Sequence, residues 1–292
     1  MTPPARRRNI AIAPQSAAAS HDVRRLAVCA DDFGLDPEVN AGALHLARLG
    51  RLSAIGCMVG APFWSGGALA LRTLDGERVD VGLHLDLTQH PLHAYLRRPL
   101  PEWILRSHSG TLDLPRLRLE IDAQLDAFAG EMQRPPAFVD GHEHVHQLPG
   151  VRDVLLEALA ARGWRPWLRS TRRPARLASG KARLIEALGA AGLERIAQAH
   201  GLRQNRTLLG VYPFDADTAA YLRSVRGWLA LARDGDLLMC HPAAGPCDWA
   251  PHAAARCREY ELLVGAAFGS MLAEAGVQIT PLSAAVRSAR AA

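Results

Sequence analysis

The sequence predicts an α/β protein built as an irregular (β/α) barrel, TIM-like, with about seven parallel strands. Short apolar segments of strand length alternate with amphipathic helical segments along most of the chain. The apolar segments lack polar alternation, as expected for strands buried on both faces of a parallel sheet. Seven or eight such units in one chain are more typical of a barrel than of an open doubly wound sheet, which is the alternative.

The first unit sets the pattern for the others. Residues 26–30 form a short apolar run, and Asp36 and Pro37 then supply an N-cap and a first helical residue. Gly50 ends this helix. Further strands are expected at residues 54–59, 79–87, 138–141, 167–169, 208–212, 237–240 and 277–280. Further helices are expected at residues 63–74, 114–132, 151–161, 181–200, 218–233 and 253–275, and a long loop at 90–110.

Length and composition suit one catalytic unit preceded by a tail. Residues 1–25 contain prolines and a Ser/Ala run and are expected to be a flexible N-terminal tail, and 26–292 a single (β/α) barrel catalytic domain. The chain has 49% hydrophobic and 22% charged residues, which is ordinary for a globular protein. No uninterrupted apolar stretch is long enough to be an integral membrane segment.

Charge and cysteine content exclude some classes of partner. The chain has 34 basic and 29 acidic residues, and this small, dispersed excess predicts no nucleic-acid binding. It leaves room for peripheral contact with an anionic membrane or for a phosphate-bearing substrate. Five cysteines without a CxxC pair, and no signal-peptide pattern, favour a cytoplasmic location. The oligomeric state is open, a homodimer included.

Polar residues stand where apolar strands end. Because the carboxyl ends of barrel strands face one mouth, residues at those ends should converge in space although they are far apart in sequence. These residues are Asp31 and Asp32 after the first strand, His84 within the third, residues 140–146 after the fourth, and His241 after the seventh.

The adjacent carboxylates Asp31 and Asp32 are one sign of a cation site. Two unpaired carboxylates in a low-dielectric site repel each other, and a cation relieves this repulsion. The alternative is an exposed turn that caps a helix, but Asp36 already serves as that cap.

The histidines at 142, 144 and 146 are a second sign. Their spacing of two would place all three on one face of an extended chain, and the alternative is a His-rich surface loop. An aspartate with two imidazoles suits one catalytic divalent metal ion, Zn²⁺ by ligand type, with Mg²⁺ or Mn²⁺ open. Spacing alone does not choose among the three, since a bend could bring His144 or His146 to the metal.

Four ordered motifs resemble those of the YdjC/ChbG-like carbohydrate deacetylases. Residues 30–35 (ADDFGL) resemble the opening of that family, and residues 81–88 (VGLHLDLT) its second motif. The third is residues 140–146 (DGHEHVH) with Pro149, and the fourth residues 239–242 (MCHP). Arg258 with Glu261 resemble the charged pair on the last helix. The resemblance runs from about residue 25 to about 283.

The resemblance implies a (β/α) barrel that holds one divalent metal ion and hydrolyses an N-acetyl group from an amino sugar. The substrate would be an oligosaccharide or a lipid-linked N-acetylhexosamine, and residues 89–110 would help to select it. The roles that it implies are metal ligands at Asp32, His84 and His142, a general base at Asp31, a general acid at His241, and substrate-binding positions at His146 and Arg169.

Two other functions compete with this one. The same ligands could serve a metal-dependent hydrolase of another amide or of a phosphoester, but we see no clear Gly-rich phosphate cradle or second metal site. A non-catalytic binding protein on the same fold is disfavoured because every candidate catalytic position is present. Trp103 and Trp249, in predicted loops, could stack on a sugar ring.

Overall fold

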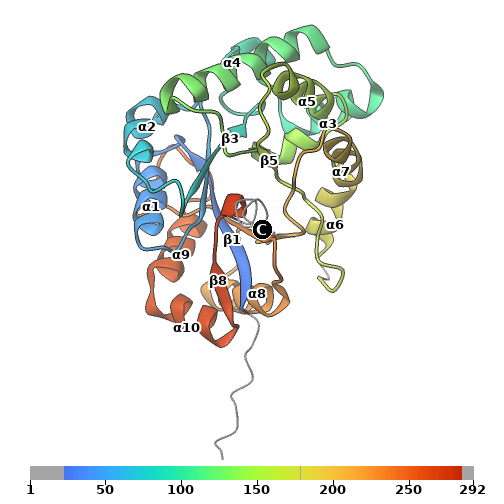
Figure 1. Cartoon of the computed structure of the whole chain (residues 1–292). Coiled ribbons are helices and arrows are strands. Elements are labelled where there is room, and N and C mark those ends of the chain that lie inside the picture. Colours follow the sequence, from blue (N-terminus) through green and yellow to red (C-terminus); the bar gives the residue numbers. More distant parts are fainter. Residues whose placement is uncertain (1–22, 178, 285–292) are drawn as a thin grey trace, which may run out of the picture.

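The computed structural model describes residues 23–177 and 179–284. Within them, eight parallel strands form one sheet in the order β5-β4-β3-β2-β1-β7-β6, with β8 paired to the start of β1 (Figure 1). The strands are β1 (Arg24–Phe33), β2 (Ala54–Cys57), β3 (Asp80–Leu85), β4 (Phe138–Gly141), β5 (Trp167–Leu168), β6 (Leu208–Leu209), β7 (Asp236–Cys240) and β8 (Val277–Ile279). Every predicted strand is found, with bounds that differ by at most three residues.

Helices surround the outside of the curled sheet (Figure 1). They are α1 (Pro37–Arg48), α2 (Trp64–Arg72), α3 (Leu100–Ser109), α4 (Leu114–Met132), α5 (Val151–Ala161), α6 (Gly180–Ala187), α7 (Ala190–Ala199), α8 (Thr218–Leu231), α9 (Ala253–Val264) and α10 (Ala266–Glu274), with the short 3₁₀ helices η1 (Ala94–Leu96) and η2 (His142–Gln147). The predicted tail lies outside the described residues up to residue 22, whereas Arg24 and Arg25 already belong to β1.

The sheet curls into an incomplete barrel. The edge strands β5 and β6 are only two residues long, and in the described chain a single bridge, Leu168 to Gln204, links these two edges. Asn205 adds side-chain bonds there, because its amide accepts from Ser170 N at 2.7 Å and donates to Ser170 O at 3.0 Å. The irregular barrel is thus confirmed, but a fully closed TIM barrel is not formed.

Alternation along the strands sorts the barrel interior into two layers. Side chains two residues apart share one face of a strand. Near the amino ends this inner face carries apolar residues, and Phe138 stacks on Trp167 with ring centroids 4.5 Å apart. Two residues further along the same strands stand Asp140 and Arg169. The polar site therefore lies above an apolar floor, at the carboxyl ends of the strands.

The segment predicted as a loop at 90–110 is instead largely helical. Pro101 stands in the first turn of α3, and Gly110 ends it in the left-handed conformation at φ 68°. Trp103 is 2% exposed and donates through Nε1 to the carbonyl of Leu87 at 3.0 Å, so it packs in the core and does not present a face to a sugar.

Two helices predicted as continuous are broken. The predicted helix 181–200 divides into α6 and α7 at Gly189, where a Cβ would lie 2.2 Å from the carbonyl oxygen of Gln147. The predicted helix 253–275 divides into α9 and α10 at Gly265, whose backbone is extended. Both breaks fall at glycines, which are poor helix formers.

The described part of the chain contains no helix with the length and apolar character needed to cross a bilayer.

The close packing of β3 on β4 generates a first prediction. A Cβ on Gly82 would lie 2.4 Å from the Phe138 ring and 2.5 Å from its carbonyl oxygen. We expect Gly82→Ala to lower the free energy of unfolding by about 1–3 kcal/mol, because the core has no room for the methyl group. Urea denaturation measures this.

The control is Gly227→Ala in α8, where a new Cβ meets nothing within 4 Å. It should be neutral or stabilising by up to about 1 kcal/mol, because alanine is the better helix former. Equal midpoints for Gly82→Ala and the parent protein would contradict the packing described.

Candidate metal and catalytic site

A bulge at the end of β1 turns two consecutive carboxylates toward one place. The pairing of β1 with β2 shifts register between Ala30 and Phe33, and Asp32 has a positive φ of 70°. In a regular strand Asp31 and Asp32 would point to opposite faces. The bulge re-aims Asp32, so that both side chains border the same cavity.

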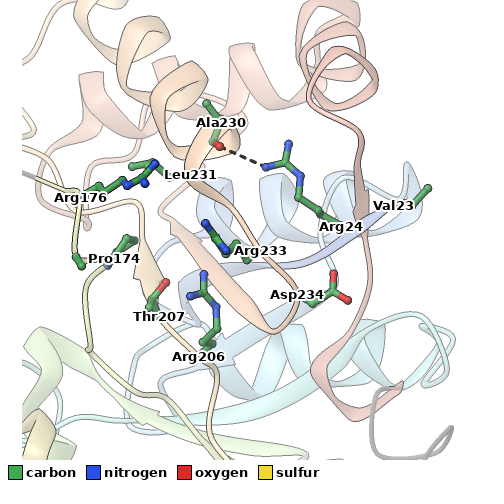
Figure 2. Close-up of a pocket in the computed structure, with 11 residues that line it drawn as sticks. Val23, Arg24, Pro174, Arg176, Arg206, Thr207, Ala230, Leu231, Arg233 and Asp234 are labelled. Atoms are coloured by element: carbon green, nitrogen blue, oxygen red, sulfur yellow. Dashed lines mark hydrogen bonds between the residues drawn. The ribbon is translucent and has the colours of Figure 1, made fainter. Parts of the chain in front are cut away.

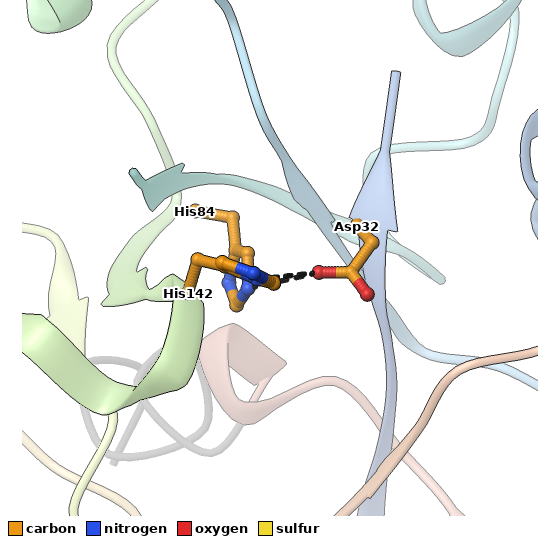
Figure 3. A group of neighbouring side chains, drawn as sticks. All are labelled: Asp32, His84 and His142. Atoms are coloured by element: carbon orange, nitrogen blue, oxygen red, sulfur yellow. Dashed lines mark hydrogen bonds and ion pairs between the residues drawn. The ribbon is translucent and has the colours of Figure 1, made fainter. Parts of the chain in front are cut away.

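Asp32, His84 and His142 come together as predicted (Figure 3). Their ligand atoms lie within 4.8 Å of one another, and all three residues are buried. His84 Nε2 is 3.3 Å and His142 Nδ1 is 3.0 Å from the same oxygen, Asp32 Oδ1. They come from the ends of β1 and β3 and from the start of η2, which follows β4.

The hydrogen bonds around His84 fit a metal ligand. Asp140 accepts from His84 Nδ1 at 2.7 Å, and its other oxygen lies 2.5 Å from Arg169 Nη2. Because an ionised carboxylate only accepts, His84 Nδ1 carries the proton, and its Nε2 faces Asp32 as a second acceptor. Two acceptors 3.3 Å apart need a proton or a cation between them, and orientation of a ligand histidine by a carboxylate is common at metal sites.

The charge state of the triad supports the same fit. Burial disfavours the charged form of each of these side chains and by itself would lower the pKa of His84. The carboxylates of Asp140 and Asp31 have the larger effect and raise the pKa of His84 well above its usual value. Burial likewise fails to raise the pKa of Asp32, which Arg256 and His142 hold well below its usual value. The site therefore binds positive charge strongly, and a divalent cation could replace the imidazole protons.

Arg169 lies beneath the triad and joins two carboxylates. Its Nη1 and Nη2 donate to the two oxygens of Asp31 at 2.5 and 2.6 Å. Burial would raise the pKa of Asp31, but Arg169 outweighs burial and holds that pKa well below its usual range. The same guanidinium group lies within a second cluster with metal-ligand spacing, formed by Cys29, Asp31 and Asp140. Because Arg169 supplies the positive charge there, this cluster needs no metal ion.

The histidine motif does not form the extended chain that its spacing predicted. Glu143 and His144 both have positive φ, 51° and 62°, so the chain turns within η2 and period-two alternation fails. His142 reaches Asp32, His144 lines the cavity, and His146 turns inward to the carbonyl of Arg169 at 2.9 Å. Among the three, only His142 joins the described ligand cluster.

His146 and Arg169 do not line the cavity, contrary to the role expected for them in substrate binding. Both are 0% exposed. The carboxylates of Asp31 and Asp140 occupy Arg169, and burial lowers the pKa of His146 to about 4, so that it is neutral. Their positions beneath the site suit support of its residues and leave no surface for a sugar.

His241 borders the cavity opposite the triad and is held from behind by a buried carboxyl group. Its Nε2 is 4.0 Å from Asp31 Oδ2, and its backbone N donates to Glu259 at 2.6 Å. Glu259 is 1% exposed and also accepts from the Tyr212 hydroxyl at 2.6 Å. Burial lowers the pKa of His241 to about 4 and raises that of Glu259 to about 7.

The charged pair on the last long helix is displaced from the one expected. Arg256 and Glu259 of α9, rather than Arg258 and Glu261, point into the site. Arg256 Nη2 donates to Asp32 Oδ2 at 2.6 Å, and its Nε donates to the carbonyl of Pro251 at 2.8 Å. The sequence does not distinguish Arg256 and Glu259 from Arg258 and Glu261, because each pair is an arginine and a glutamate three residues apart. Which pair faces the site depends on the rotation of the helix about its axis, which the sequence did not determine.

The site opens into a cavity of about 660 Å³. Polar groups, among them His144, Lys181 and Arg256, and apolar side chains both line it. Most of the apolar lining comes from α3, from α6 with its C-cap, and from the segment after β6, and includes Leu100, Ile104, Leu184, Ile185, Leu188, Pro213 and Phe214. Part of the segment 89–110 thus does reach the site.

Comparison with known proteins places this geometry in a family. The model of YdjC-like proteins matches residues 25–274. A carbohydrate deacetylase from Homo sapiens is 32% identical over 88% of this chain and 90% of its own length. A chitooligosaccharide deacetylase from Enterobacter sp. (strain 638) is also 32% identical, over 47% of this chain and 56% of its own.

Solved structures share the fold at low identity. A candidate cellobiose-phosphate cleavage protein from Enterococcus faecalis has a TM-score of 0.65 at 20% identity, covering 89% of this chain and 98% of its own. A peptidoglycan N-acetylglucosamine deacetylase has a TM-score of 0.50 at 10% identity, covering 88% and 86%. The match over residues 25–274, together with the human relative that spans most of both chains, shows that this chain belongs to the YdjC-like protein family.

Proposed function

We propose that this protein is a metal-dependent carbohydrate deacetylase that hydrolyses the N-acetyl group of an amino sugar. The observation that carries the proposal is the convergence of Asp32, His84 and His142 on one cavity that Asp31 and His241 also border. Relatives with the names carbohydrate deacetylase and chitooligosaccharide deacetylase support the reaction class.

Asp32, His84 and His142 would hold one divalent ion. Their donor set, one carboxylate and two imidazoles, favours Zn²⁺, and Mg²⁺ is the alternative. When bound, such an ion polarises a carbonyl oxygen and lowers the pKa of water to about 7. Arg256 would keep Asp32 ionised and fixed, because it binds the oxygen that faces away from the histidines.

Asp31 and His241 would move the proton. Asp31 would take it from the attacking water, and Arg169 keeps that carboxylate ionised and oriented. His241 is neutral near pH 7 because burial lowers its pKa to about 4, and its Nε2 lies 4.0 Å from Asp31. We propose that His241 receives this proton and delivers it to the leaving nitrogen. General acid–base catalysis of this kind increases the reaction rate by roughly 10²–10⁴-fold.

The cavity wall supports a substrate with an apolar part beside the sugar. Besides the polar groups, α3 and α6 contribute leucine and isoleucine side chains to the lining of the cavity. Leu184, which is 63% exposed, lines this cavity. Contact with an apolar part of a substrate would remove its side chain from water, which is favourable. We propose a lipid-linked N-acetylhexosamine as the preferred substrate, with an N-acetylated oligosaccharide as the alternative.

Release of acetate tests the proposed reaction. The metal-loaded protein should release acetate from an N-acetylhexosamine substrate, and a chelator should abolish the release. Asp32→Asn should lose the bound metal and at least about 10³-fold in kcat/KM, because a neutral amide is a poor ligand. Elemental analysis and an acetate assay measure both effects.

The control for this variant is Asp248→Asn, which makes the same chemical change at an exposed position. It should keep both metal and activity. A protein that carries metal and retains its fold, yet releases acetate from neither a lipid-linked nor an oligosaccharide substrate, would contradict the proposal.

The buried carboxyl group of Glu259 makes stability depend on pH. Burial raises its pKa to about 7, from the usual 4.5, so the folded protein holds a proton that the unfolded chain releases between these values. Its contribution to stability is complete below about pH 4.5 and is lost as pH rises through 7. This contribution amounts to at most about 3 kcal/mol.

Glu259→Gln should remove this part of the pH dependence, because glutamine does not titrate. Free energies of unfolding from urea denaturation at pH 4.5 and 7.5 measure it. Glu274→Gln, at an exposed position of α10, is the control and should keep the parent slope. The same slope in Glu259→Gln as in the parent protein would show that Glu259 is already ionised in the folded state.

Leu184 tests the proposed substrate preference. Leu184→Gln should lower kcat/KM for a lipid-linked N-acetylhexosamine by about tenfold, since burying most of a leucine contributes about 1.5 kcal/mol or more. It should change kcat/KM for a short oligosaccharide less than twofold. Leu119→Gln on α4 is the matched control, because Leu119 is 59% exposed and lies outside the cavity. Equal losses on both substrates would favour the oligosaccharide.

A further inference from the structure

A second cavity, of about 540 Å³, lies at the other end of the barrel (Figure 2). Most of its residues stand at or before the amino ends of β1, β6 and β7, and three more, Pro174, Ala175 and Arg176, lie between β5 and α6. The proposed catalytic residues instead follow the carboxyl ends of their strands. Arg24 begins β1 and Asp31 is seven residues further along it, a separation of about 23 Å in a strand. A ligand in this cavity would therefore not reach the catalytic site.

Four arginines and one aspartate line this cavity. They are Arg24, Arg176, Arg206, Arg233 and Asp234. Positive groups gathered on a concave surface with low-dielectric walls focus the field and attract anions. Asp234 already accepts from the backbone N of Arg25 at 2.7 Å.

Two of the arginines are fixed in place by the fold. Arg24 donates to the carbonyls of Ala232 at 2.8 Å and Ala275, and no carboxylate in residues 23–177 and 179–284 forms an ion pair with it. Arg206 donates to the buried carboxylate of Asp236 at 2.6 Å. Such anchored guanidinium groups lose little further conformational entropy when they bind an anion.

The other two arginines, Arg176 and Arg233, differ from this pair in their contacts. Within the described part of the chain, the side chains of Arg176 and Arg233 make no hydrogen bond or ion pair, and both are exposed. Figure 2 shows Arg206 and Arg233 among the side chains that line the cavity. Arg176 and Arg233 therefore add positive charge to this cavity that the described structure does not compensate, and a bound anion would compensate it.

We propose that this cavity binds a phosphate group. Guanidinium groups match phosphate oxygens in pairs, and arginine is the preferred residue for this recognition. The cavity is far larger than one phosphate ion, so its ligand is a phosphate-bearing molecule, either a soluble phosphate ester or the headgroup of an anionic lipid. Binding here is independent of deacetylation, because the site lies at the opposite end of the strands.

Calorimetric titration with inorganic phosphate and with glycerol 3-phosphate, at constant ionic strength, tests the proposal. The metal-loaded parent protein should bind glycerol 3-phosphate saturably. Arg176→Gln/Arg233→Gln should bind it at least about tenfold more weakly. The control Arg195→Gln/Arg223→Gln has the same net charge and changes exposed arginines outside the cavity, so it should stay within twofold of the parent.

Vesicles distinguish the two sources of phosphate. Phosphatidylcholine vesicles with and without phosphatidylglycerol are mixed with the three proteins and sedimented. Association that needs phosphatidylglycerol and is lost only in Arg176→Gln/Arg233→Gln identifies a lipid headgroup, and phosphate-ester binding without vesicle association identifies a soluble ligand. Binding of neither, or equal losses in both double variants, overturns the proposal. Acetate release should be the same in all three proteins, so failure here leaves the proposed reaction untouched.

Discussion

The bridge that Arg169 makes between Asp31 and Asp140 is the interaction on which the site depends. Its guanidinium group is completely buried, and removing such a charge from water costs several kcal/mol. The two carboxylates offset this cost only while both stay ionised and in place. Through Asp140 the bridge orients His84 toward Asp32, and through Asp31 it fixes the group that faces His241. One buried cation therefore positions residues on both sides of the cavity, the proposed metal ligand His84 and the proposed base Asp31.

Strained backbone conformations at three residues turn side chains toward the cavity that would point elsewhere from a regular strand. Asp32, Glu143 and His144 all have positive φ, which costs a non-glycine residue about 1–2 kcal/mol each. The surrounding structure holds them there: Arg256 and two histidines bind Asp32, and the inward bond of His146 fixes the far end of η2. Strained residues cluster at functional sites, and here each of the three adjoins the same cavity.

Apolar runs were sufficient to predict the strands, and the convergence of their carboxyl ends predicted that Asp32 and His84 meet one of the three histidines. The choice of His142 among the three came from the family resemblance alone. The sequence was insufficient where backbone conformation departs from the regular period. Glutamate and histidine are not residue types that predict a left-handed turn, so Glu143 and His144 gave no sign of one. The three histidines were therefore expected to lie on one face of an extended chain. The pair Arg256 and Glu259 was missed for a similar reason, since helix phase depends on packing that composition does not reveal.

The charges of the polar layer also explain why the two ends of the barrel suit opposite ligands. Near the triad, the carboxylates of Asp31, Asp32 and Asp140 outnumber the guanidinium groups of Arg169 and Arg256, so with neutral histidines the layer is left negative. That excess favours a cation, whether histidine protons or a divalent ion, and a divalent ion would stabilise the negative charge that the proposed hydrolysis develops on the acetyl oxygen. At the amino ends arginines predominate instead. In β1, β6 and β7 the buried residues Ala27, Leu208 and Leu237 stand between the two ends, so each end can keep its own sign of charge.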